Sequence, residues 1–161
     1  MIIADSIFLN NQDRYLSNCL SFSGYNLTLF NSTFINNTAI IDISIIELFL
    51  TNVTGLSDIA QLNPEIGGAL SFEGVNMLIN MSCFIANMGL EGGAIYVTSY
   101  ALDVHQYVMI SESYFKGNRG NVGGAIDFDI NLQWIDAAIV FCVFVANSGK
   151  SKKIYIRFII N

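Results

Sequence analysis

Hydrophobic and polar positions alternate along this chain in short runs that are typical of β-strands. In "GGALSFEG" (67–74) and "GGAIDFDI" (123–130), apolar residues occupy alternate positions, and β-branched and aromatic residues are frequent throughout the sequence. No stretch of three turns keeps an apolar stripe of helical period together with helix caps. The pattern therefore predicts an all-β fold made of short strands.

The same phrases recur along the chain. Residues 20–37 and 70–87 match without a gap at nine of eighteen positions. A phrase F-x-x-N recurs at Phe8/Asn11, Phe34/Asn37, Phe84/Asn87, Phe115/Asn118 and Phe144/Asn147. The gaps between these phenylalanines are 26, 50, 31 and 29 residues, and we divide the gap of fifty into two units of about 25. Residues 38–66 are then a degenerate copy of the unit.

A unit of this length cannot bury its own apolar face, but copies stacked on one another can. If successive units stack about 4.8 Å apart as parallel strands, equivalent positions fall into columns. Phenylalanine then stacks on phenylalanine, and each asparagine amide can bond to the next. The sequence predicts a parallel β-helix of about six coils of roughly 25–31 residues, in a single segment spanning 1–161.

Paired glycines are the second half of the repeat. They stand at Gly67 and Gly68, Gly92 and Gly93, and Gly123 and Gly124. Each pair opens an apolar run, so it suits a corner that needs a positive φ or has no room for a Cβ atom. Neither G-x-G-x-x-G nor G-x-x-x-x-G-K is present, and a strand follows where a nucleotide-binding loop would need a helix.

The recurring GGA[IL] (67–70, 92–95 and 123–126) combined with F-x-x-N resembles the repeat of the chlamydial polymorphic outer-membrane proteins. That repeat also occurs in surface proteins of other bacteria and of protists. The resemblance covers nearly the whole chain and implies a right-handed, pectin-lyase-like parallel β-helix in an extracellular or cell-surface protein, often regarded as an adhesin. The matching positions are structural, so the resemblance implies neither catalytic residues nor a cofactor.

The open ends of such a stack would expose core and strand edges. We therefore expect a piece of a longer array, with flanking repeats of the same chain or a capping domain as partners. The longest coil contains the segment 98–107, which we expect to protrude as a loop carrying the one histidine, His105. His105 is either a ligand or pH-sensitive contact, or an ordinary loop residue.

Outer-face carboxylates are the candidates for chemistry. Asp127 and Asp129 alternate with inward residues, and Glu73 aligns with the Asp129 column two coils away. They could hold Ca²⁺ or act as acid and base in a polysaccharide lyase or hydrolase. No Lys or Arg shares their columns, and the Asn-Thr-Asp, Asp-Asp and His-Gly signatures of such enzymes are absent. We interpret them as solvated surface charges, and expect no catalytic or metal site.

Aromatic residues and cysteines allow similar alternatives. Trp134, Tyr96, Tyr100 and Tyr107 either line a sugar-binding surface or stack between coils. Three cysteines, Cys19, Cys83 and Cys142, have no metal-ligand spacing. We interpret them as small buried hydrophobic residues.

Composition excludes some classes of function. Thirteen acidic residues outnumber seven basic ones, four of which lie in the last dozen residues, so the acidic body argues against nucleic-acid binding. The start of the chain has no signal-peptide pattern, and "AIIDISIIELFL" is too short and too charged for a transmembrane segment.

Five N-x-[ST] sequons occur, at Asn26, Asn31, Asn36, Asn52 and Asn80. They arise either from composition or from use as glycosylation acceptors on a surface protein. The sequence thus favours a non-enzymatic surface or secreted β-helix segment, an adhesin-like module or spacer that contacts glycans or surface proteins. A carbohydrate-active enzyme is the alternative.

Overall fold

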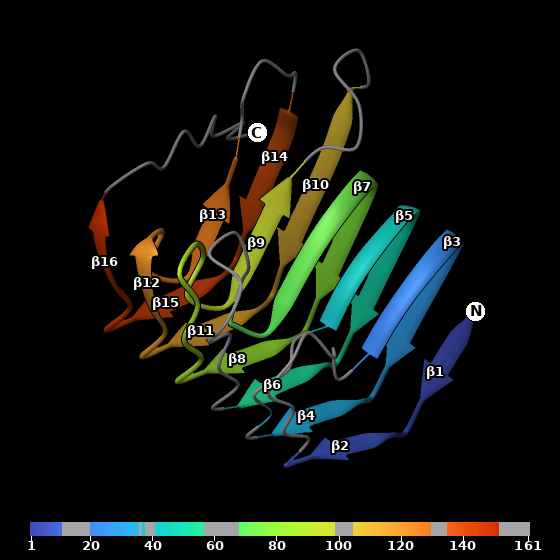
Figure 1. Cartoon of the computed structure of the whole chain (residues 1–161), viewed down its shortest axis with the longest axis horizontal. Helices are drawn as coiled ribbons and strands as arrows, with labels where there is room; N and C mark the ends of the chain where they lie inside the picture. Colours follow the sequence, from blue (N-terminus) through green and yellow to red (C-terminus); the bar gives the residue numbers. More distant parts are fainter. Residues whose placement is uncertain are drawn as a thin grey trace.

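A computed structural model of the chain describes residues 1–10, 20–35, 37, 41–56, 68–98, 105–129 and 135–151. The residues in these ranges form strands joined by short turns, and none of them is helical. Every pair of hydrogen-bonded strands among them is parallel and joins equivalent positions of neighbouring coils. The predicted all-β parallel solenoid is confirmed, and Figure 1 shows its coils stacked from β1 and β2 to β14, β15 and β16.

The largest sheet supplies two walls of the solenoid. Its main path contains β1 (Ile2–Ala4), β3 (Leu20–Phe30), β5 (Ile41–Thr51), β7 (Leu70–Asn80), β10 (Gln106–Ser111) and β14 (Ile135–Val140). The strands β9 (Ile95–Thr98) and β13 (Ile126–Phe128) join it through β7. The first half of β7 pairs with β9 and its second half with β10. We call these halves, with the strands stacked on them, the first wall and the second wall; Figure 1 shows the long strands bending from one to the other.

The third wall is a sheet of three-residue strands. It consists of β2 (Ile7–Leu9), β4 (Thr33–Ile35), β6 (Thr54–Leu56), β8 (Cys83–Ile85), β11 (Tyr114–Lys116) and β15 (Val143–Val145). On the remaining side, β12 (Arg119–Val122) pairs with β16 (Ser148–Ser151), and two isolated bridges join β12 to residues 88 and 91 of the preceding coil. Each coil therefore passes through the first, second and third walls in turn.

The segment 38–66 is a coil of the stack where it is described. Within it, β5 and β6 pair in register with strands of the coils on both sides. Hydrogen bonds between equivalent positions of neighbouring coils join residues 26, 21, 29, 31 and 29 apart along the stack. The coil of 21 residues is shorter than the predicted 25, because five residues connect β4 to β5 whereas nine connect β8 to β9.

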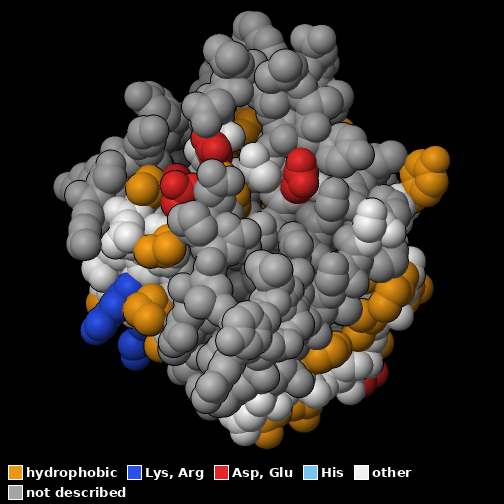
Figure 2. Space-filling view, viewed as in Figure 1, with side chains coloured by type: hydrophobic (Ala, Val, Ile, Leu, Met, Phe, Trp, Pro, Cys, Tyr) orange, Lys and Arg blue, Asp and Glu red, His pale blue; other side chains and the backbone are white. Residues whose placement is uncertain are grey.

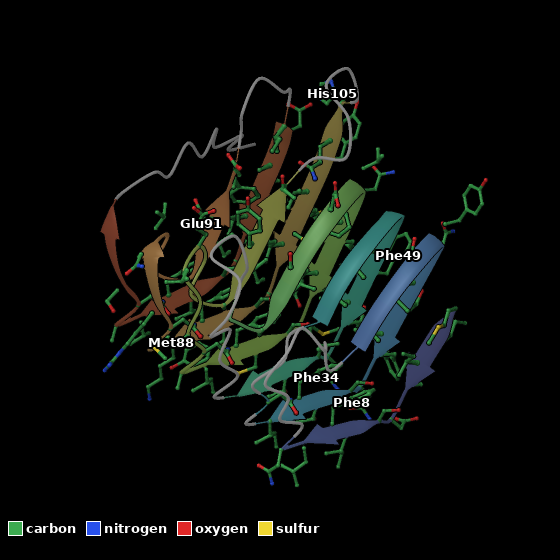
Figure 3. All side chains as sticks on the ribbon, in the orientation of Figure 1. Phe8, Phe34, Phe49, Met88, Glu91 and His105 are labelled. Carbon is green, nitrogen blue, oxygen red and sulfur yellow. The ribbon has the colours of Figure 1, made fainter. Side chains whose placement is uncertain are left out.

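The predicted loop 98–107 has different limits. Thr98 is the last residue of β9, and Gln106 and Tyr107 begin β10. Strand pairing continues to these residues because both β9 and β10 are stacked on β7. Residues 99–104 of the predicted loop lie outside the described residues, while His105 precedes β10 at the edge of the second wall (Figure 3).

The core runs along the inside of the stack. Inward positions of the second wall form columns such as Leu29, Leu50, Ile79 and Ile110, all of which are fully buried. The first wall adds Leu70, Phe72, Ile95 and Val97. Because each coil covers the next, apolar burial is continuous along the axis and does not need a separate layer of helices.

Candidate functional site

The phenylalanines of F-x-x-N lie inside the third wall. The rings of Phe84 and Phe115 stack with centroids 5.1 Å apart, and those of Phe115 and Phe144 are 4.7 Å apart. Phe8 and Phe34 stack at 4.5 Å near the other end, and Figure 3 shows the two side by side. Gly55 takes the place between Phe34 and Phe84, so the degenerate coil interrupts the column.

The asparagines of the phrase form a ladder of three residues, in which Asn87 and Asn118 are buried and Asn147 is half-buried. The Asn87 Nδ2 donates to Asn118 Oδ1 at 3.0 Å and to the carbonyl of Gly55 at 3.1 Å. Asn118 repeats this pattern one coil later, donating to Asn147 Oδ1 and to the carbonyl of Phe84. Each oxygen also accepts the backbone N–H of the preceding asparagine. These amides hold neighbouring coils together.

The N-terminal end of the asparagine column is described in part. Asn37 is buried, and its Nδ2 donates to the carbonyl of Phe8 at 3.2 Å. Asn11 lies outside the described residues. The contacts of Asn37 follow the same rule as those of the ladder, since each amide reaches the carbonyl at the phenylalanine position of the coil before it. That carbonyl belongs to Phe8 for Asn37, to Gly55 for Asn87 and to Phe84 for Asn118.

The paired glycines have two different roles. The first glycine adopts a left-handed backbone, with φ of 60° at Gly92 and 53° at Gly123. The second has no room for a side chain, because a Cβ on Gly93 would lie 2.1 Å from the carbonyl oxygen of Gly124. A Cβ on Gly68 would meet the Gly93 oxygen at 2.3 Å. Gly67 lies outside the described residues. The pair thus shapes a corner and lets coils approach closely.

A column of serines lies at the corner between the second and third walls. The hydroxyls of Ser32, Ser82 and Ser113 donate to the carbonyl two residues before them, and Ser82 Oγ accepts the Val53 N–H. Cys142 occupies the next position, and its Sγ lies 3.4 Å from the Val140 oxygen. Cys83 and Cys142 are half-buried, and burial raises the pKa of both thiols. Cys19 lies outside the described residues.

The aspartates of the first wall, Asp127 and Asp129, are not both exposed to solvent. Asp127 is paired in register with Tyr96, and only 4% of Asp127 is exposed, which overturns its interpretation as a solvated charge. Strand alternation predicts that the Asp127 side chain points away from the core. It does not predict whether other residues cover that side chain. Asp129 is half-buried and accepts the Tyr96 hydroxyl at 3.1 Å. Glu73 pairs with Thr98, as the column alignment requires.

Tyr96 is buried within this acidic surface. Burial raises the pKa of its hydroxyl, and the charge and hydrogen bond of Asp129 and the charge of Glu91 raise it further. Figure 2, which views the side of β7, β9 and β13, shows acidic side chains on this face and Lys and Arg near its lower left. The buried phenol is therefore held in its neutral, donating form.

Alkaline pH should destabilise the protein through Tyr96. The pKa is raised in the folded state, so the associated stability is fully present below the unfolded value of 10.0 and is lost as pH rises above it. We expect the free energy of unfolding of Tyr96→Phe to fall less between pH 9 and pH 11 than that of the unmodified chain. Chemical denaturation at several pH values measures this. Equal slopes for the two proteins would contradict it.

A shallow groove lies on the outer face of the second wall. It encloses about 450 Å³ and is lined mainly by outward residues of β5, β7, β10 and β14. Its lining residues are Phe49, Asn76, Met77, Leu78, Tyr107, Val108, Met109, Asp136, Ala137 and Ala138. The side chain of Tyr107 is half-exposed here, whereas Tyr96 is buried on the first wall, so the two tyrosines do not form one surface. Tyr100 and Trp134 lie outside the described residues.

His105 stands beside this groove. Its ring stacks on that of Tyr107 at 4.7 Å and 9°, and its Nε2 lies 2.9 Å from Asp136 Oδ2. The histidine therefore has specific contacts with side chains of two coils. Figure 3 places it at the start of β10, on the other side of the stack from Met88 and Glu91.

The sequence did contain a signal for the groove. Three apolar residues in a row occur at 48–50, 77–79 and 108–110, so the central one must point outward when its neighbours point inward. These central residues, Phe49, Leu78 and Met109, are in register on consecutive coils. Only comparison across coils would have revealed their alignment.

Four of the five sequons are described. Asn26, Asn31 and Asn52 are exposed, and Asn80 is half-buried and accepts the Ser111 hydroxyl at 2.9 Å. Asn52 Nδ2 donates to Asn31 Oδ1 at an exposed corner. Asn36 lies outside the described residues.

Within the described ranges, no three His, Cys, Asp or Glu side chains are placed to hold a metal ion, and no helix there could cross a membrane.

The fold and its surfaces define a parallel β-solenoid whose repeated residues lie inside the stack. Comparison of the chain with protein-family models, curated proteins and solved structures finds no match.

Proposed function

We propose that the chain is a non-enzymatic β-helix segment of an extracellular or cell-surface protein, serving as an adhesin-like surface or a structural spacer. The observation that carries this proposal is the ladder of Asn87, Asn118 and Asn147, whose amides bond between coils. The most regular polar residues thus join neighbouring coils to one another. The resemblance to the polymorphic outer-membrane protein repeat supports the same role. Flanking repeats or a capping domain would cover the end coils.

The alternative, a polysaccharide lyase or hydrolase, would depend on Asp127, Asp129 and Glu73. Asp127 is buried and Asp129 accepts the Tyr96 hydroxyl, so neither carboxylate stands free for an incoming sugar. A carboxylate that acts as acid or base must reach the substrate within hydrogen-bonding distance. The geometry therefore favours the non-enzymatic role.

We expect the recombinant chain to release no reducing ends or unsaturated products from a panel of pectic and neutral polysaccharides. The double variant Asp127→Asn/Asp129→Asn is the matched control, because it separates activity of this chain from a contaminant. Cleavage by the unmodified chain that disappears in the variant would overturn the proposed function. Cell and matrix adhesion assays then distinguish an adhesive surface from a spacer.

A further inference from the structure

The floor of the second-wall groove is an apolar stripe that the core does not use. Phe49, Leu78, Met109 and Ala138 are aligned by strand pairing on four consecutive coils. Their immediate neighbours in each strand point inward, so this column faces outward, and 46% of Met109 is exposed. A continuous apolar column on the outside of a fold with a complete interior indicates a contact surface.

A polar column flanks this stripe on one side, and a pair of polar residues flanks it on the other. Asn76, Tyr107 and Asp136 are aligned on one side, two positions earlier in each strand. Asn80 and Ser111 are paired on the other side, two positions later, and Ser111 Oγ donates to Asn80 Oδ1 at 2.9 Å. The polar column runs parallel to the coil axis, about 7 Å from the stripe. The groove thus has an apolar floor and one hydrogen-bonding side, made by Asn76, Tyr107 and Asp136, whereas Asn80 and Ser111 do not line it.

Tyr107 is fixed in position at one side of the groove. His105 covers one face of its ring and is itself held by Asp136, 2.9 Å from the histidine Nε2. Tyr107 and Met109 line the groove, and Met109 lies two residues beyond Tyr107 on the same face of β10, whereas His105 lies two residues before it and does not line the groove. The groove therefore lies on the side of Tyr107 away from His105. A ring braced in this way loses little conformational entropy when a ligand packs on it.

These features fit one ligand chemistry. A pyranose presents an apolar C–H face, which suits the stripe and the tyrosine ring, and hydroxyl edges, which suit the polar side made by Asn76, Tyr107 and Asp136. None of the described residues lining the groove is Lys or Arg, and Asp136 is acidic, which disfavours anionic sugars. An apolar protein segment would cover the Asn76 amide and the Tyr107 hydroxyl of the groove without offering them a hydrogen bond.

We propose that this groove binds a neutral oligosaccharide lying along the coil axis. The inference rests on the proposed non-enzymatic surface role and gives it a ligand class. Tyr107 and Met109 contribute the contact area, and Asn76 and Asp136 bond to hydroxyl groups. The groove spans four consecutive coils.

The test uses the recombinant chain on an array of neutral, anionic and cationic oligosaccharides, followed by calorimetry with the best neutral one. We expect saturable binding that Tyr107→Ala weakens at least tenfold and Met109→Asp abolishes. Tyr25→Ala is the matched control, because Tyr25 is 78% exposed on the same sheet and does not line the groove. Circular dichroism confirms that each variant is folded.

Three results would overturn the proposal: no binding to any neutral oligosaccharide, binding that Tyr107→Ala and Tyr25→Ala affect equally, or selective binding of anionic sugars. The proposed function fails on a different result, namely cleavage of the bound oligosaccharide.

Discussion

Replacing Asn118 with leucine is expected to lower the free energy of unfolding by about 3 kcal/mol, although the two side chains are similar in size. The Asn118 Oδ1 accepts both the N–H and the Nδ2 of Asn87, and its Nδ2 donates to Asn147 and to the carbonyl of Phe84. Leucine removes all four bonds from a fully buried position. Because water cannot replace them there, the polar groups left behind carry most of the cost.

The measurement is urea unfolding followed by circular dichroism. Asn121→Leu is the matched control, because Asn121 is exposed on β12 and its backbone N–H, which donates to the Leu90 carbonyl, is retained. We expect this control to change the free energy of unfolding by less than about 0.5 kcal/mol. Asn87→Leu should resemble Asn118→Leu, since it occupies the same column. Equal effects of Asn118→Leu and Asn121→Leu would contradict a buried ladder.

The second large effect is expected at the glycine pair. In Gly93→Ala the new Cβ would lie 2.1 Å from the Gly124 oxygen and 2.6 Å from the Arg119 nitrogen, and both are backbone atoms. The backbone of one coil must therefore move away from the next, which we expect to cost about 3 kcal/mol. Chemical denaturation measures the loss.

Gly117→Ala separates close approach from backbone strain. Gly117 has a φ of 65°, but a Cβ there would meet no atom within 4 Å. Ala86 and Ala146 occupy the equivalent corners of neighbouring coils with φ of 56° and 53°. The fold thus accepts alanine at this corner, and we expect a cost of roughly 1 kcal/mol. If Gly117→Ala proved the more damaging of the two, glycine would be required for conformation and not for coil spacing.

The stacked columns could be predicted because stacking makes equivalent residues touch. Phe84, Phe115 and Phe144 recur in the sequence for the same reason that their rings are in contact. The asparagine and glycine positions follow from the same argument. The sequence could also have indicated the groove, since Phe49, Leu78 and Met109 each interrupt the alternation at aligned positions.

Other features depend on contacts that local pattern does not encode. Met81, Glu112 and Phe141 adopt left-handed backbones at one corner, with φ of 46°, 50° and 54°. Their residue types do not favour this conformation, but the N–H groups of Met81 and Glu112 bond to carbonyls of the next coil, which fixes the corner. Burial of Asp127 was missed for a similar reason, because alternation gives the direction of a side chain and not its surroundings.

The central claim is that the repeated polar residues join coils to one another. A double-mutant cycle with Asn87→Leu, Asn118→Leu and the combined variant tests this directly, because the two amides are 3.0 Å apart across 31 residues of sequence. We expect the combined loss to be smaller than the sum of the single losses by at least about 1 kcal/mol. Losses that add within about 0.5 kcal/mol would show that the two asparagines act independently and would contradict the ladder.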